Sequence, residues 1–111
     1  MIAIEQKKKY GAIETYVSFS TLNRIRHFKI KGLLESGIET MQNRLQADKD
    51  TLLIEMGGYV FRELGKEGKN HHVRIEGEEK EILDRMSKEL NLYTKHISMY
   101  AIHLGLNKNG R

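Results

Sequence analysis

The sequence predicts a mainly α-helical fold with a two-stranded antiparallel ribbon, built from two similar strand–helix–helix units in one chain. Two stretches, HFKIKG at 27–32 and HVRIEG at 72–77, alternate polar and apolar residues and end at a glycine, 45 positions apart. Each is followed by apolar residues at spacings of three and four, as amphipathic helices require. A lone strand leaves its backbone groups unpaired, so we expect the two strands to pair with each other.

Length and composition limit the classes of protein that the chain can belong to. Its 111 residues suffice for one domain or for two very small units that share a core. The absence of cysteine excludes disulfides and thiolate zinc sites. The apolar runs are too short for a membrane span, and the first residues lack the apolar stretch of a secretory signal. We therefore expect an intracellular, cytoplasmic protein that does not enter a membrane.

The net charge of +4 is unevenly distributed along the chain. Residues 1–31 contain seven Lys or Arg and two Glu, which gives +5 and leaves −1 for residues 32–111. A basic leading segment on a nearly neutral body indicates an anionic partner, although a solvated surface would carry the same charges.

Residues 1–25 are predicted to form a basic N-terminal arm. Its QKKKY stretch could lie along DNA or be a frayed end. Residues 12–20, AIETYVSFS, alternate like a strand. That strand could add an edge to the ribbon, cover the core or help two molecules pair, and the residues leave these alternatives open.

The unit at residues 71–107 shows the repeated pattern most clearly. Alternation over 72–76 predicts a strand with one buried face. The following GEEKEILDRMSKELN begins with acids, which suit a helix N-terminus, and has apolar residues on one helical face. Thr94 is the expected N-cap of a second helix that ends near Gly105.

The unit at residues 26–64 follows the same order when it is shifted by 45 positions, so that His27 falls on His72 and Met41 on Met86. The linker between the units, GKEGKN at 65–70, could span about 20 Å, enough to lead the chain back to the ribbon. Close helix packing is the expected reason for the Gly57-Gly58 pair in this unit.

The stretch HVRIEG-EEKEILDRMSKELN-LYTKHISMYAIHLGL resembles the ribbon–helix–helix unit of Arc- and MetJ-type DNA-binding regulators. The resemblance covers residues 71–106 and, more loosely, 26–64. In that family two strands form a ribbon that enters the major groove, above a core of four helices. The chain is similar to tandem regulators of this kind from archaeal viruses, which implies a single-chain pseudo-dimer. It also implies an autoregulatory transcription regulator, in the host cytoplasm if viral, that binds double-stranded DNA and could self-associate on it.

The resemblance assigns base contacts to the outward face of the two predicted strands. Arg and Lys donate to guanine, and Glu accepts from the cytosine amino group. Because the two strands differ, asymmetric readout is expected. The expected base-contact residues are His27, Lys29, Lys31, His72, Arg74 and Glu76.

Phosphate contacts are expected from the arm and from the N-terminus of the second helix of each unit, where the helix dipole favours anions. Asp48 and Asp50 flank one of these helix starts and should weaken it. The expected phosphate-contact residues are Lys7, Lys8, Lys9, Lys49, Thr51, Thr94, Lys95 and His96.

Other chemistry has little support in the sequence. His71 and His72 should point to opposite faces of a strand and cannot bind one metal together. No phosphate-binding glycine loop or nucleophile motif is present, so we expect no metal, no cofactor and no catalysis. The alternative to DNA binding is a protein-interaction module, antitoxin-like or structural, although the tail after Leu106 is too short to wrap a partner.

Overall fold

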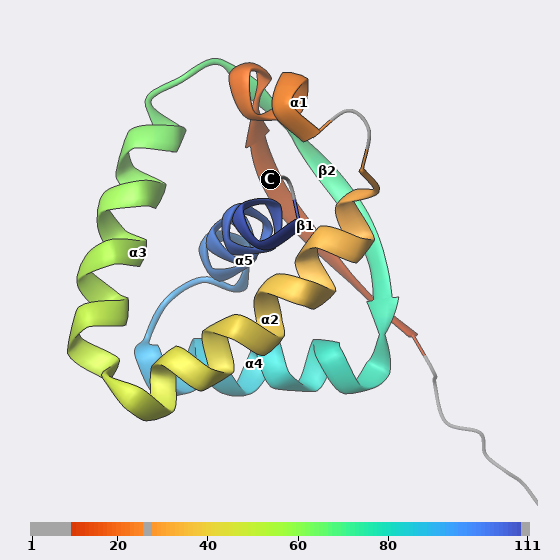
Figure 1. The fold of residues 1–111 in the computed structure, drawn as a ribbon. Helices are drawn as coiled ribbons and strands as arrows, with labels where there is room; N and C mark the ends of the chain where they lie inside the picture. Colours follow the sequence, from red (N-terminus) through yellow and green to blue (C-terminus); the bar gives the residue numbers. More distant parts are fainter. Residues whose placement is uncertain (1–9, 26–27, 110–111) are drawn as a thin grey trace, which may run out of the picture.

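The computed structural model describes residues 10–25 and 28–109, which form five helices and one two-stranded antiparallel sheet. This confirms the predicted class of a mainly helical fold with an antiparallel ribbon. Figure 1 shows α5 near the centre, with α3 on one side of it and the ribbon on the other. The elements are β1 (Tyr10–Ser18), α1 (Phe19–Ile25), α2 (Ile30–Ala47), α3 (Lys49–Leu64), β2 (Gly68–Glu76), α4 (Gly77–Leu90) and α5 (Thr94–Asn109).

The ribbon pairs β1 with β2 along their whole lengths, from Tyr10 opposite Glu76 to Ser18 opposite Gly68. Alternate side chains of a strand point to opposite faces, and here one face lies on the helices. The buried face contains Ile13, Thr15 and Val17 of β1 with Val73 and Ile75 of β2. The apolar alternation of both strands therefore fixes the register, because a slip by one residue would expose this face to water.

The predicted location of the first strand, residues 27–31, is wrong. Lys29 has extended backbone angles but is the N-cap of α2, and the chain is helical from Ile30 onward. Leu33, Leu34, Gly37, Ile38 and Met41 are buried at helical spacing, so burial over a long helix outweighs a short local alternation. The strand that pairs with β2 lies in the predicted N-terminal arm, and residues 10–25 of that arm therefore belong to the folded body.

The centre of the core is the crossing of α2 and α5, where two glycines let the backbones touch. A Cβ atom on Gly37 would lie 1.6 Å from the carbonyl oxygen of Ala101. A Cβ atom on Gly105 would lie 2.0 Å from the carbonyl oxygen of Leu33. α5 is buried on nearly all sides, since Ile97, Ser98, Met99, Tyr100, Ala101, Ile102, Leu104 and Leu106 are all inaccessible.

The shift of 45 positions relates α3 to α5 but does not relate the two strands. α5 begins 45 positions after α3, as the sequence predicts, and each of the two has 16 residues. β2 begins 58 positions after β1, because α1 and a connection stand between β1 and α2, whereas α4 follows β2 directly. The packing of the two halves is also unequal, since α5 is buried on nearly all sides, whereas α3 lies to one side of α5 and buries one face (Figure 1).

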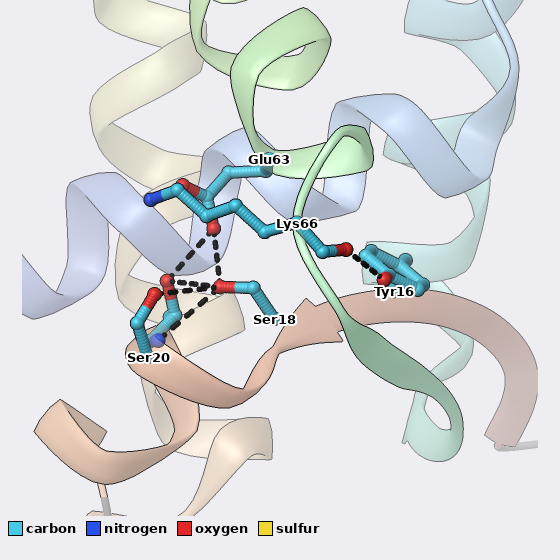
Figure 2. A network of polar contacts seen from close by, with 6 residues as sticks. Tyr16, Ser18, Ser20, Glu63 and Lys66 are labelled. Atoms are coloured by element: carbon cyan, nitrogen blue, oxygen red, sulfur yellow. Dashed lines mark hydrogen bonds and ion pairs between the residues drawn. The ribbon is translucent and has the colours of Figure 1, made fainter.

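A buried carboxylate ties the end of α3 to the end of β1 (Figure 2). The Glu63 carboxylate accepts hydrogen bonds from Ser18 Oγ at 2.6 Å, Thr21 Oγ1 at 2.9 Å and Lys66 Nζ at 2.8 Å. Burial raises the pKa of Glu63, but the hydrogen bonds from Lys66, Ser18 and Thr21 outweigh it and lower the pKa below its usual value. Tyr16 also donates to the carbonyl of Lys66, so both contacts anchor the connection that leads into β2.

Candidate nucleic-acid interface

The outward face of the ribbon presents side chains from both strands to solvent. β2 contributes Asn70, His72, Arg74 and Glu76, all exposed, at alternate positions. Opposite them, β1 places Ala12 across from Arg74, Glu14 across from His72, and Tyr16 across from Asn70. Tyr16 is half-buried, and Ala12 and Glu14 are exposed. The ribbon therefore offers one continuous polar face, made of different residues on its two strands.

The charges on this face are mixed. Glu14 lies at the middle pair of the ribbon, with a carboxylate oxygen 3.9 Å from His72 Nε2 and the other 4.0 Å from Lys95 Nζ. Arg74 lies two pairs away, on the same face and opposite the methyl group of Ala12. The guanidinium and the Asn70 amide are the groups of β2 suited to donate to purine edges.

The N-terminus of α5 lies beside β1. A protein that inserts a β-ribbon into the major groove needs contacts to the DNA backbone next to the ribbon. Ala12, Ile13 and Glu14 line one pocket together with Thr94 and Lys95; its remaining lining residues are Lys80 and Tyr93. The helix dipole and Lys95 both favour an anion at this end. The structure thus brings two of the predicted phosphate-contact residues, Thr94 and Lys95, next to the ribbon.

His96 suits a phosphate contact less well than the sequence predicts. Its backbone N–H donates to the carbonyl of Tyr93 at 3.0 Å, and its ring packs edge-on against the Tyr93 ring. Burial, and then the positive charge of Lys95, lower the pKa of His96, which favours the uncharged ring at neutral pH.

The predicted contact at the start of α3 lies away from the ribbon. Asp48 caps this helix, accepting from Thr51 N at 3.2 Å and from Thr51 Oγ1 at 2.7 Å. The Thr51 hydrogen bonds lower the pKa of Asp48, which keeps a negative charge at this helix start. In Figure 1 the start of α3 lies at the opposite side of the molecule from β1 and β2. Lys49 and Thr51 are therefore not brought together with the ribbon.

The predicted base-contact residues of the first unit do not lie on the ribbon. Lys29 is an exposed residue at the start of α2. Lys31 lies in the first turn of that helix, with its Nζ 3.6 Å from Glu76 and 3.9 Å from Glu35. Lys31 therefore contacts the Glu76 side chain at the end of β2 and is not its counterpart on a second strand. His27, Lys7, Lys8 and Lys9 lie outside the described residues.

Sequence reasoning missed four residues of the outward face, namely Ala12, Glu14, Tyr16 and Asn70. The alternation of residues 12–18, AIETYVS, carried the signal for the β1 residues, whereas residues 68–71, GKNH, do not alternate and gave no signal for Asn70. Residues 27–31 also alternate, and they directly precede a predicted helix, as residues 72–76 do. The sequence pattern therefore favoured them over residues 10–18 as the strand that pairs with β2.

The two adjacent histidines of β2 lie on opposite faces of the strand. His71 points inward, where burial lowers its pKa, and His72 points outward, which confirms that they lie on opposite strand faces. Among residues 10–25 and 28–109, no three His, Asp or Glu side chains are grouped closely enough to hold a metal ion. Within the same residues, every helix is too short or too polar to cross a bilayer.

Comparisons of the chain with protein-family models, curated proteins and solved structures found no match.

Proposed function

We propose that the chain is a sequence-specific regulator that binds double-stranded DNA with the outward face of its ribbon. The observation that carries this proposal is the exposed two-stranded face bearing Arg74, Asn70 and His72. A two-stranded β-ribbon fits the major groove, and Arg and Asn make the common bidentate contacts to guanine and adenine.

We further propose that the chain is a single-chain pseudo-dimer of two strand–helix–helix units. One unit is β1 with α2 and α3, and the other is β2 with α4 and α5. The common order of elements, the antiparallel pairing of the two strands and the 45-residue shift between α3 and α5 support this relation. The insertion of α1 and the outer position of α3 are departures from two-fold symmetry.

The two strands would then read the two halves of a site differently. β2 would use Arg74 for guanine and Asn70 for adenine. β1 would use the Ala12 methyl group against thymine and the Glu14 carboxylate against cytosine. A homodimer with identical strands favours a palindrome, whereas this face favours an asymmetric site.

The test begins with selection of duplexes from a random pool and measures affinity by fluorescence anisotropy. Arg74→Ala should weaken binding to the selected site by roughly 1–3 kcal/mol and change affinity for random DNA little. Lys88→Ala is the matched control, because Lys88 is an exposed cation near the far end of α4 from the ribbon. It removes the same charge and should leave both affinities unchanged.

Glu14→Ala distinguishes recognition of a cytosine by the carboxylate from electrostatic repulsion of the phosphates. If Glu14 reads cytosine, its removal relaxes the preference at one position of the site. If it only repels phosphates, its removal tightens binding to every sequence alike. No enrichment of any sequence, or equal effects of Arg74→Ala and Lys88→Ala, would refute the proposal and favour the protein-interaction module.

A further inference from the structure

α3 carries an apolar stripe on the face that points away from the core. Ile54, Phe61 and Leu64 are 75%, 82% and 43% exposed, and Gly57 lies between the first two. These positions are three or four residues apart, so they lie on one face of the helix. The opposite face is the buried one, formed by Leu52, Met56, Tyr59, Val60 and Glu63.

This exposure is not a general property of the surface helices. The exposed residues of α4 are all charged, namely Glu78, Glu81, Arg85, Lys88 and Glu89. α3 needs only its buried face to pack against the body. A second apolar face on such a helix indicates that a partner covers it.

We propose that two copies of the chain associate through this stripe, with their α3 helices antiparallel about a two-fold axis between Gly57 and Gly58. In that arrangement Ile54 faces Phe61 of the other copy, and Gly57 faces Gly58. Large residues therefore meet large ones while the glycines meet at the centre, where a Cβ on Gly57 would contact nothing within 4 Å. The contact is self-complementary, as a two-fold dimer requires.

The charges at the two ends of α3 favour the antiparallel arrangement. Asp50 lies in the first turn on the same face as Ile54, and Arg62 lies in the last turn. Antiparallel helices place Asp50 opposite Gly65 of the other copy, whereas parallel helices would place Asp50 against Asp50. Lys49 would approach Lys66 of the other copy, whose charge is balanced by Glu63 at 2.8 Å.

The size of the stripe sets the expected strength. A phenylalanine buries at most about 250 Å², so three apolar side chains per copy cover roughly half of the ~800 Å² that each partner of a standard interface buries. We therefore expect a reversible dimer with a dissociation constant in the micromolar range. This inference does not depend on DNA binding, and its test contains no DNA.

Sedimentation velocity of the full chain, from about 1 µM to about 500 µM, measures this equilibrium. Phe61→Ser should raise the dissociation constant at least tenfold. Tyr93→Ser is the matched control, because Tyr93 is an aromatic residue 74% exposed outside the helices, and it should leave the constant unchanged. A chain that stays monomeric throughout, or equal effects of the two variants, overturns the proposal.

Cysteine cross-linking tests the orientation, because the chain has no cysteine of its own. Gly57→Cys should form a disulfide-linked dimer under mild oxidation, since this position lies next to the two-fold axis. Asp50→Cys should not link to itself, because the two Asp50 positions are about 22 Å apart along antiparallel helices. A disulfide requires Cα atoms within about 7 Å. Efficient self-linking of Asp50→Cys would show parallel helices and overturn the proposed arrangement.

Discussion

Gly37→Ala is expected to lower the free energy of unfolding by about 2 kcal/mol, because it places a methyl group into the crossing of α2 and α5. The new Cβ would lie 1.6 Å from the carbonyl oxygen of Ala101 and 2.8 Å from its Cα. Both are backbone atoms, so no side-chain rotation relieves the overlap. To reach an ordinary contact of about 3.5 Å, the two helices must separate by about 2 Å.

The magnitude follows from what this separation disturbs. Leu33, Leu34, Ile38 and Met41 of α2 are all buried and would lose part of their contacts with α5. Overpacking of this kind costs about 1–3 kcal/mol, and a backbone overlap belongs at the upper end of that range. Alanine gains up to about 1 kcal/mol over glycine in a helix, which leaves a net loss of about 2 kcal/mol.

Gly32→Ala is the matched control in the same helix. Gly32 is exposed, and a Cβ there would contact nothing within 4 Å. The same substitution should therefore stabilise the protein slightly, by up to about 1 kcal/mol. Urea unfolding followed by circular dichroism measures both variants, and the slope against urea should stay unchanged. If Gly37→Ala proves as stable as Gly32→Ala, the two helices do not cross at Gly37.

Two carboxylates should respond to pH in opposite directions. Glu63→Ala should cost about 1–3 kcal/mol at neutral pH because it removes the charged acceptor of the Ser18 and Thr21 hydroxyls. The lowered pKa of Glu63 means that this loss is complete above the ordinary pKa of a glutamate and fades as the pH falls below it. Burial, and then the Glu35 charge, raise the pKa of Glu79, so Glu79→Gln should stabilise the protein at neutral pH. That gain should vanish in acid, where both proteins are uncharged at this position; urea midpoints at neutral and acidic pH measure both effects.

The helices were predictable because their signals are local. The apolar spacing of residues 82–90 and the expected N-cap at Thr94 predicted α4 and the start of α5 within a few residues, although Thr94 is the first residue of α5 and not its cap. The same spacing allowed α3 to be located from α5 by the shift of 45 positions. No comparable pattern predicted α1, because this helix has only seven residues and two buried side chains, Thr21 and Ile25.

The pairing of the strands could not be predicted from local signals. Polar and apolar residues alternate in both 27–31 and 10–18. Only the packed structure shows that the first of these segments runs into helix α2, whereas the second forms the strand β1. The position of the candidate site depends on that pairing, because the register decides which residues lie beside Arg74. Lys29 and Lys31 were thus expected on the ribbon and lie at the start of α2, whereas Glu14 and Tyr16 lie on the ribbon.

The two proposed surfaces can be occupied at the same time. The ribbon and α3 lie on opposite sides of α5 in Figure 1, and the apolar stripe of α3 points away from the core. A dimer through α3 would therefore leave both ribbons exposed at its opposite ends. Because the two ribbons would face away from each other, they could not enter one straight groove together. Dimerisation would then join two DNA segments without changing the contacts that either ribbon makes. Phe61→Ser should accordingly keep the affinity of each copy for its site, and a loss of that affinity would show that the two surfaces are coupled.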